Sequence, residues 1–406
     1  MIRELTSDCV HCGFCLPTCP TYVLWSEEMD SPRGRIHLMD ARLDGTMTLN
    51  ATVTEHFDRC LGCMACVSSC PSGVRYDRLI EATRAAVEAE YERPLADRFL
   101  RGLLFRILPY PERMRVALRL APLGRFTPMP RRFRPLVELA PPWQARGSVP
   151  AVTPAVGESR GRVGLLTGCV QRVAFADVNC ATARVLAADG FEVAAPPQGC
   201  CGALSVHAGR LEEGKAFARR LVDAFDGIDV VIVNSSGCGS HLKELGWLLE
   251  DERAAAFSEK VRDIGEFLGG VAPRARRHPL PMRVAVQDSC HLRHAQGLPF
   301  ASRASLTRIP GLEAVEPAEQ DLCCGSAGIY NLVEPEAARE LGERKAKHVL
   351  ATGAQAYASA NPGCLVQVSQ ALRRAKRPLP ALHPIELVDA SIRGVPAGTL
   401  KTTARR

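Results

Sequence analysis

Apolar residues in the first 92 positions recur at the spacing of helices. Ile36, Met39 and Leu43 follow an Asp-Ser-Pro sequence, which is typical of a helix start with proline in the first turn. Further helices are predicted over residues 52–58 and 76–91. This part of the chain is therefore predicted to be mainly helical.

From residue 161 onward, short apolar strands alternate with helices, and the alternation occurs twice. Each half opens with a strand that leads to a cysteine: RVGLLTGC reaches Cys169 and RVAVQDSC reaches Cys290. A helix (ATARVLAADG or SRASLTRI), a Cys-Cys-Gly sequence, another helix and a second strand leading to a cysteine follow. The first cysteine precedes the Cys-Cys pair by 31 positions in one half and by 33 in the other. This repetition predicts two duplicated α/β units with parallel strands.

The duplication supplies four cysteines in each half, and these eight are possible cofactor ligands. They are Cys169, Cys200, Cys201, Cys238, Cys290, Cys323, Cys324 and Cys364. Four of them are predicted to follow strand ends, where parallel sheets gather their ligands, so the set is expected to converge. The glycine after each Cys-Cys pair is expected to let the backbone approach bulky inorganic sulfide. Structural zinc and reduced core thiols remain alternatives for these residues.

Two cysteine runs near the N-terminus carry the most specific signal. Both read C-x2-C-x2-C-x3-C-P, at residues 9–20 and 60–71, which is the spacing of bacterial ferredoxins that bind two [4Fe–4S] clusters. The fourth cysteine of such a run usually reaches the other cluster. The predicted iron ligands are therefore Cys9, Cys12, Cys15 and Cys70 for one cluster, and Cys60, Cys63, Cys66 and Cys19 for the other. Two such clusters would carry one electron at a time.

Zinc and disulfide bonds fit these two runs less well. Zinc sites usually use two Cys-x2-Cys pairs, and disulfides are typical of exported proteins. The sequence after Met1 has neither the basic region nor the apolar region of a signal peptide. A cytoplasmic location is therefore expected, where a chain with 17 cysteines more often binds metal.

The length and composition are typical of a packed protein with two or three domains. The chain has 406 residues and is 46% hydrophobic, and no apolar run approaches the ~18 residues of a membrane-spanning helix. The predicted parts are a two-cluster ferredoxin domain (1–92), a basic helical segment with a linker (93–160), two Cys-Cys-Gly domains (161–278 and 279–395) and a basic tail (396–406). The fold class is thus α+β and multidomain.

The positive charge is concentrated in the second of these parts. Ten arginines lie between Arg98 and Arg134, and Glu112 is the one acidic residue among them. One interpretation is a pair of solvated helices that pack on the rest of the protein. The other is a basic amphipathic surface that contacts anionic lipid on the inner face of the cell membrane, or an acidic partner subunit. Nucleic acid is not an expected partner, because no base-stacking aromatic residues accompany the arginines.

Other residues near the cysteines are expected to play supporting roles. His241 stands three positions after Cys238, and Gln367 stands three after Cys364; His241 is more readily a hydrogen-bonding neighbour than an iron ligand. Cys180 belongs to no motif and is expected to be a buried thiol. No G-x-G-x-x-G sequence opens a βαβ unit, so FAD or NAD is not expected on this chain.

Taken together, these motifs resemble the iron–sulfur subunit of bacterial glycolate oxidase (glycolate dehydrogenase) over nearly the whole length. The segments that carry the resemblance include CVHCGFCLPTCPTYVL, DSPRGRIHLM, DRCLGCMACVSSCPSGVRY, SSGCGSHLKE and LCCGSAGIYNL. The duplicated Cys-Cys-Gly domain is similar to that of the heterodisulfide reductases. In that family each full motif has a fifth cysteine, whereas this sequence has His241 and Gln367 at those positions.

The resemblance implies an electron-transfer subunit without a substrate site of its own. It implies flavoprotein partner subunits that oxidise glycolate at FAD, two [4Fe–4S] clusters on the eight N-terminal cysteines, and electron flow toward a quinone. A further cluster in the Cys-Cys-Gly domains is also compatible with it. The alternatives are the iron–sulfur subunit of a lactate or glycerol-3-phosphate dehydrogenase, a catalytic subunit that reduces a disulfide or quinone, and a zinc-bound scaffold.

Overall fold

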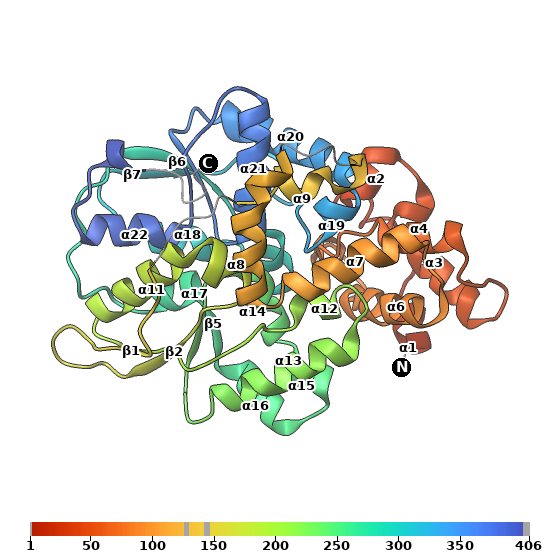
Figure 1. The fold of residues 1–406 in the computed structure, drawn as a ribbon, viewed down its shortest axis with the longest axis horizontal. Helices are drawn as coiled ribbons and strands as arrows, with labels where there is room; N and C mark the ends of the chain where they lie inside the picture. Colours follow the sequence, from red (N-terminus) through yellow and green to blue (C-terminus); the bar gives the residue numbers. More distant parts are fainter. Residues whose placement is uncertain (1, 126–129, 142–146, 401–406) are drawn as a thin grey trace.

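The computed structural model describes residues 2–125, 130–141 and 147–400. In Figure 1 the N-terminal helices, drawn in red and orange, lie on one side of two β-sheets that belong to the green and blue parts of the chain. Within the described residues no helix is both long and apolar enough to cross a membrane.

The N-terminal part is helical, as the spacing of its apolar residues predicts. Its elements are α1 (Ile2–Ser7), α2 (Pro20–Trp25), η1 (Glu28–Asp30), α3 (Pro32–Leu43), α4 (Ala51–Asp58), α5 (Ala65–Ser68) and α6 (Tyr76–Glu90). The side chain of Ser31 caps α3 by accepting a hydrogen bond from Gly34 N at 3.0 Å. Ile36, Phe57 and Leu79 belong to the apolar core among these helices. The cysteine runs occupy the loops and short turns between them.

The basic segment forms helices that pack beside this part. They are α7 (Leu95–Ile107), α8 (Pro111–Leu120), η2 (Ala121–Arg125), η3 (Arg131–Phe133) and α9 (Arg134–Glu138). Leu100, Leu104 and Phe105 are buried against Ile329 of the second Cys-Cys-Gly half. The predicted linker also contains a short strand, β1 (Val152–Thr153), which the sequence pattern does not reveal because only two residues pair.

The first Cys-Cys-Gly half folds as parallel strands separated by helices. Its elements are β2 (Arg162–Leu166), α10 (Val170–Ala174), α11 (Ala176–Ala188), β3 (Glu192–Ala194), α12 (Ala203–Val206), α13 (Leu211–Ala224), β4 (Val231–Val233), α14 (Ser236–Leu242), α15 (Leu245–Leu249), α16 (Glu252–Lys260), β5 (Val261–Asp263) and α17 (Ile264–Gly270). The strand order is β1-β3-β2-β4-β5, in which only β1 is antiparallel to its neighbour.

The second half repeats this arrangement. Its elements are β6 (Met282–Gln287), η4 (His291–Ala295, one π turn), α18 (Ala301–Leu306), β7 (Leu312–Val315), α19 (Tyr330–Val333), α20 (Pro335–Ala351), β8 (Ala356–Ser359), α21 (Pro362–Arg374), β9 (Ala381–Leu382), α22 (Pro384–Ile392) and η5 (Ala397–Thr399). The parallel order β7-β6-β8-β9 matches β3-β2-β4-β5 strand for strand. The predicted duplication and the α+β fold class are therefore confirmed.

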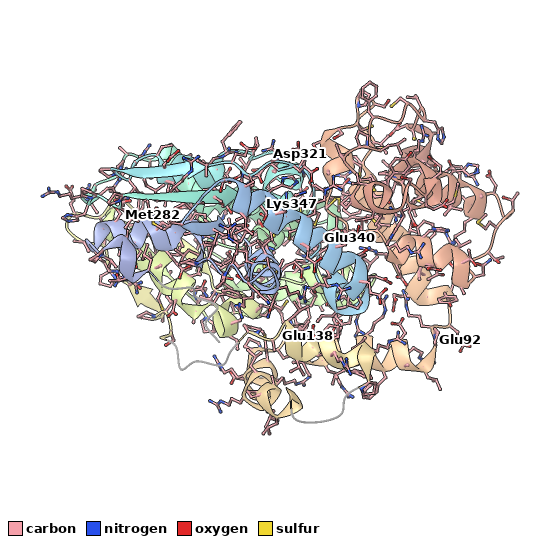
Figure 2. All side chains as sticks on the ribbon, turned by 90° about the horizontal axis from the view of Figure 1, so that it is seen from above. Glu92, Glu138, Met282, Asp321, Glu340 and Lys347 are labelled. Carbon is pink, nitrogen blue, oxygen red and sulfur yellow. The ribbon has the colours of Figure 1, made fainter. Side chains whose placement is uncertain are left out.

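The two halves share one apolar core. Val163 and Leu165 of β2 belong to the same buried cluster as Val284 and Val286 of β6. Helices α11 and α22 pack against each other at this boundary, and Arg184 donates hydrogen bonds to both carboxylate oxygens of Asp389, at 2.9 and 2.8 Å. Figure 2 shows α20, marked by Glu340 and Lys347, between Met282 of β6 and the N-terminal part. One apolar cluster and one pair of helices thus join the two halves.

Each Cys-Cys-Gly sequence ends at a close contact between backbone segments. Gly202 precedes α12 with φ +95°, and a Cβ there would lie 2.5 Å from the carbonyl oxygen of Gly214 in α13. Gly325 has φ +87°, and a Cβ there would lie 2.6 Å from Ala338 O in α20. The missing Cβ of these glycines thus makes room for the backbone of α13 and α20, while a close approach of their backbone to inorganic sulfide stays a prediction.

Replacing either glycine by alanine is expected to destabilise the protein. A left-handed conformation costs a residue with a Cβ about 1–2 kcal/mol, and in Gly202→Ala and Gly325→Ala the overlap with a helix carbonyl adds to this. Gly199→Ala is a matched control, because Gly199 lies beside Cys200 and a Cβ there meets nothing within 4 Å. Urea unfolding followed by circular dichroism measures the difference. Equal midpoints for all three variants would contradict the packing role.

Candidate cofactor sites

Four cysteines from both ends of the N-terminal part line one cavity, which we name the first cavity. Cys9, Cys12 and Cys15 reach it from the loop between α1 and α2, and Cys70 reaches it from the turn after α5. Left-handed backbone at His11 (φ 53°) and Gly13 (φ 86°) curls this loop so that its cysteines face inward. Cys12 is exposed, so the first cavity lies at the protein surface.

The other four N-terminal cysteines line a second cavity. Cys60 and Cys63 come from the loop between α4 and α5, Cys66 comes from α5, and Cys19 comes from the start of α2. All four are buried. The structure therefore brings together the two sets of four that the sequence spacing predicts, with Cys19 and Cys70 each crossing to the other run. Cys66 also touches the first cavity.

The cysteines of the two Cys-Cys-Gly halves converge on one larger cavity, the central cavity, of about 250 Å³. All eight candidates line it: Cys169, Cys200, Cys201, Cys238, Cys290, Cys323, Cys324 and Cys364. They follow the carboxyl ends of β2, β4, β6 and β8 or occupy the Cys-Cys-Gly loops. The sulfur atoms of Cys169 and Cys200 lie 3.4 Å apart, and those of Cys290 and Cys323 lie 4.0 Å apart.

The three cavities are adjacent in space and share walls. Pro32, Cys66 and Tyr76 line both the first and the second cavity. The loop from Cys60 to Met64 lines both the second and the central cavity. The three cysteine-lined cavities thus form a row of adjoining sites from an exposed edge of the N-terminal part to the boundary between the two halves.

The donor set in these cavities fits iron–sulfur clusters. Four thiols line the second cavity, and four besides the shared Cys66 line the first, which is the number that a [4Fe–4S] cluster uses. Among residues 2–125, 130–141 and 147–400, no three His, Cys, Asp or Glu side chains are arranged to hold a single metal ion. The cysteines instead surround spaces, and a cluster spreads its ligands around its own iron and sulfide atoms.

Comparison with known proteins identifies the family. A 4Fe-4S dicluster domain matches residues 5–74, and a cysteine-rich domain matches residues 163–243 and 284–369. The probable glycolate oxidase iron-sulfur subunit of Bacillus subtilis is 37% identical over 90% of this chain and 89% of its own length. The glycolate oxidase iron-sulfur subunit of Escherichia coli is 36% identical over 96% of each chain. This chain belongs to the glycolate oxidase iron–sulfur subunit family.

More distant relatives match only part of the chain. Lactate utilization protein A of Oceanobacillus iheyensis is 28% identical and covers 57% of this chain and 98% of its own length. Among solved structures, a hypothetical protein from Helicobacter pylori aligns with a TM-score of 0.52 at 10% identity, over 89% of this chain and 68% of its own. That likeness concerns the fold alone.

A buried arginine sets the charge beside the second cavity of this family member. Arg35 donates hydrogen bonds to His56 O at 2.6 Å, to Thr21 Oγ1 and to the carboxylate of Asp30 at 3.2 Å. Burial raises the pKa of Cys60, but the charges of Arg35 and Arg84 outweigh it and leave that pKa below its ordinary value. The Cys60 sulfur also accepts hydrogen bonds from Gly62 N at 3.4 Å and from the Tyr76 hydroxyl at 3.7 Å.

In the central cavity, one thiol of each Cys-Cys pair has a lowered pKa. The pKa of Cys200 is lowered mainly by the hydrogen bond from Cys169, and next by the hydrogen bond from Cys201. The pKa of Cys324 is lowered mainly by the hydrogen bond from Cys323, and the positive charge of Lys345 lowers it further. A lowered pKa favours the thiolate, which is the form of cysteine that binds metal. Cys200 and Cys324 are therefore suited to metal binding.

The residues three positions after Cys238 and Cys364 are buried and contact backbone carbonyl oxygens. His241 Nε2 lies 3.1 Å from Cys201 O, and burial lowers the pKa of His241 to about 3. Gln367 donates a hydrogen bond to Ala338 O at 2.6 Å. The expectation of a buried thiol at Cys180 is wrong, because that residue is half-buried on α11.

Sequence reasoning missed several polar residues around the cavities. Glu81 Oε1 lies 2.8 Å from His207 Nδ1, although 126 positions separate the two residues. Arg84 donates hydrogen bonds to the carbonyl oxygens of His207, at 2.7 Å, and of Cys60. Nothing in the local sequence distinguishes Glu81 or Arg84 on the helix α6.

Removing the buried charge of Arg35 is expected to destabilise the N-terminal part strongly. In Arg35→Met, the fully buried carboxylate of Asp30 loses one of its two arginine partners, and breaking a buried ion pair costs about 3–5 kcal/mol. Arg59→Met is the matched control, because Arg59 contacts the same carboxylate at 3.0 Å but is partly exposed; its loss should cost about 1 kcal/mol or less. Thermal unfolding monitored by circular dichroism compares them. Equal losses of stability in Arg35→Met and Arg59→Met would show that burial of the Arg35–Asp30 ion pair is unimportant.

Proposed function

We propose that this chain is the electron-transfer subunit of a glycolate oxidase complex, and that it passes electrons from a partner flavoprotein toward a quinone-type acceptor. The observation that carries the proposal is the row of three cysteine-lined cavities that share walls. Family membership supports glycolate as the substrate of the complex, since the two glycolate oxidase relatives cover 90% and 96% of the chain. The lactate utilization relative covers 57%.

The proposed ligands are those of the two small cavities, with a further site in the central cavity. Cys9, Cys12, Cys15 and Cys70 would hold one [4Fe–4S] cluster, and Cys19, Cys60, Cys63 and Cys66 the other. The eight cysteines of the central cavity would hold a further iron–sulfur group. When bound, such clusters accept and release single electrons.

The chain's own residues would set how readily the second site accepts an electron. Arg35 places a buried positive charge beside Cys60, and the backbone of Gly62 and the Tyr76 hydroxyl donate hydrogen bonds to the Cys60 sulfur. Hydrogen bonds to the sulfurs and burial are two of the properties by which a protein tunes such sites. Each of these donors favours the more negative, reduced state of the site.

The proposed entry point for electrons is the exposed loop at the first cavity. Val10 and Phe14 flank Cys12 and are 68% and 66% exposed, which suits contact with a partner subunit. FAD is assigned to that partner, because this sequence offers no dinucleotide-binding glycine motif.

On the basic segment, Phe99 and Leu120 are exposed beside arginines, and this segment would contact the membrane surface or another subunit.

The experiment that tests the proposal compares the chain alone with the chain plus its flavoprotein partners, under anaerobic conditions. Alone, the chain is expected to contain iron and sulfide but no flavin, and not to oxidise glycolate. With the partners present, glycolate should bleach the visible absorbance of the iron–sulfur subunit. Glycolate oxidation by the chain alone, or zinc in place of iron, would overturn the proposal.

A pair of cysteine variants localises the transfer. Cys63→Ala removes a ligand of the second cavity, so glycolate should still reduce the partner flavin while passage to an external acceptor falls at least tenfold. Cys180→Ala is the control, because Cys180 lies on α11 and lines none of the three cavities. Its transfer rate should equal that of the unaltered chain.

A further inference from the structure

Beyond the central cavity lies a fourth one, of about 160 Å³, which we name the histidine cavity. It forms where α6 of the N-terminal part meets α14 and α15 of the first half and η4 of the second half. The residues that matter for its chemistry are Arg78, Glu81, His207, His241, Trp247 and His291. No cysteine lines this cavity among the described residues.

The histidine cavity continues the row of cysteine cavities. Met64, Glu81, His207 and His291 line both this cavity and the central cavity. His241 lines the histidine cavity, and its Nε2 lies 3.1 Å from the carbonyl oxygen of Cys201, which lines the central cavity. A molecule in the histidine cavity would therefore adjoin the cavity at the end of the row.

Two buried nitrogen atoms in this cavity have no hydrogen-bond partner within the described part of the chain. One is His207 Nε2, on the opposite side of a ring whose Nδ1 lies 2.8 Å from Glu81 Oε1. The other is Arg78 Nε, whose guanidinium group lies over the ring of Trp247 at 4.7 Å from its centroid. Buried polar atoms are usually paired with protein groups or ordered water, so these two nitrogen atoms are available to donate hydrogen bonds to a ligand or water in the cavity.

The charges around the cavity favour an uncharged ligand. Arg75 pairs with Asp77 at 2.6 Å and with Glu244 at 3.0 Å, and Arg78 lies 3.5 Å from Glu244. Glu81 pairs with His207. Because both arginines face carboxylates, the cavity has no surplus positive charge for a hydroxy-acid anion. Trp247, Met64 and Leu248 add apolar walls, which suit a flat aromatic or quinonoid ring.

We propose that the histidine cavity binds the head group of the quinone-type acceptor, with His207 and Arg78 donating hydrogen bonds to its carbonyl oxygens. This assignment rests on the proposed electron-transfer function. The reduction would convert two C=O groups to two C–OH groups and consume two protons and two electrons, which reduced iron–sulfur clusters held by the cysteine sites would supply one at a time. His207, protonated at Nε2 and held by Glu81 at Nδ1, gives one proton to a carbonyl oxygen and regains it from solvent. The second proton comes from solvent at the open side of the cavity.

The kinetic test uses the cluster-loaded chain, reduced anaerobically with dithionite and freed of excess reductant. It is mixed with a water-soluble benzoquinone, 2,3-dimethoxy-5-methyl-1,4-benzoquinone, and the return of visible absorbance is followed by stopped flow. In His207→Gln and in Arg78→Gln, oxidation by the quinone should slow at least tenfold relative to oxidation by ferricyanide, and the ferricyanide rate itself should stay unchanged in Arg78→Gln, whose residue does not line the central cavity. His348→Gln is the matched control, since His348 lies on α20 and pairs with Glu319 away from the cavity.

The binding test uses the fluorescence of Trp247 in the unreduced chain. The same quinone should quench the emission, and the concentration-dependent part should vanish in Trp247→Phe. Trp25→Phe is the control, because Arg59 lies over Trp25 at the same 4.7 Å but outside the cavity. The fluorescence measurement requires no electron transfer and no His207 or Arg78 variant. It therefore tests binding even if one of the kinetic variants folds poorly.

The outcomes separate this proposal from the one on which it rests. If the unaltered chain shows no visible absorbance to bleach, the electron-transfer function fails. If the chain is reduced and reoxidised normally but His207→Gln, Arg78→Gln and His348→Gln react equally fast with the quinone, the histidine cavity is not the acceptor site. If glycolate quenched the fluorescence of Trp247 and the quinone did not, the proposal of a quinone site would also be overturned.

Discussion

The loop from Cys60 to Met64 is the constraint on which the arrangement of sites depends. It lines the second and the central cavity at once, so its position decides whether the N-terminal cysteines and the Cys-Cys-Gly cysteines lie side by side. Gly62 O is 3.0 Å from His291 Nε2 of the second half. Arg84 of α6 binds Cys60 O and, in the first half, His207 O. This short loop therefore connects the N-terminal part, to which it belongs, with both Cys-Cys-Gly halves.

The duplicated halves provide the surface against which this loop packs. Their sheets have matching strand orders and share one apolar core, and the boundary between them is closed by α11 against α22. A boundary built in this way leaves the carboxyl ends of β2, β4, β6 and β8 facing a common space, where the eight cysteines meet. The duplication therefore does more than repeat a motif, because neither half encloses the central cavity by itself.

The sequence predicted the parts of the molecule that depend on local spacing. The helices at residues 32–43 and 76–90, the strands before Cys169 and Cys290, and the α+β class all follow from periodicity. Other features depend on contacts between distant segments. The partner of His207 comes from α6, 126 positions away, and the glycines at 202 and 325 face helix backbone that no local pattern reveals. The edge strand β1 is too short to leave a periodic signal.

The most direct test of this account concerns the crossing of the two cysteine runs. Among the EPR signals of the dithionite-reduced chain, Cys12→Ala should change one and Cys63→Ala should change another. Because Cys70 lines the first cavity and Cys19 the second, Cys70→Ala should change the same signal as Cys12→Ala, and Cys19→Ala the same signal as Cys63→Ala. If Cys70→Ala instead changed the signal that Cys63→Ala changes, each run would bind its own cluster, and the row of sites described here would be wrong.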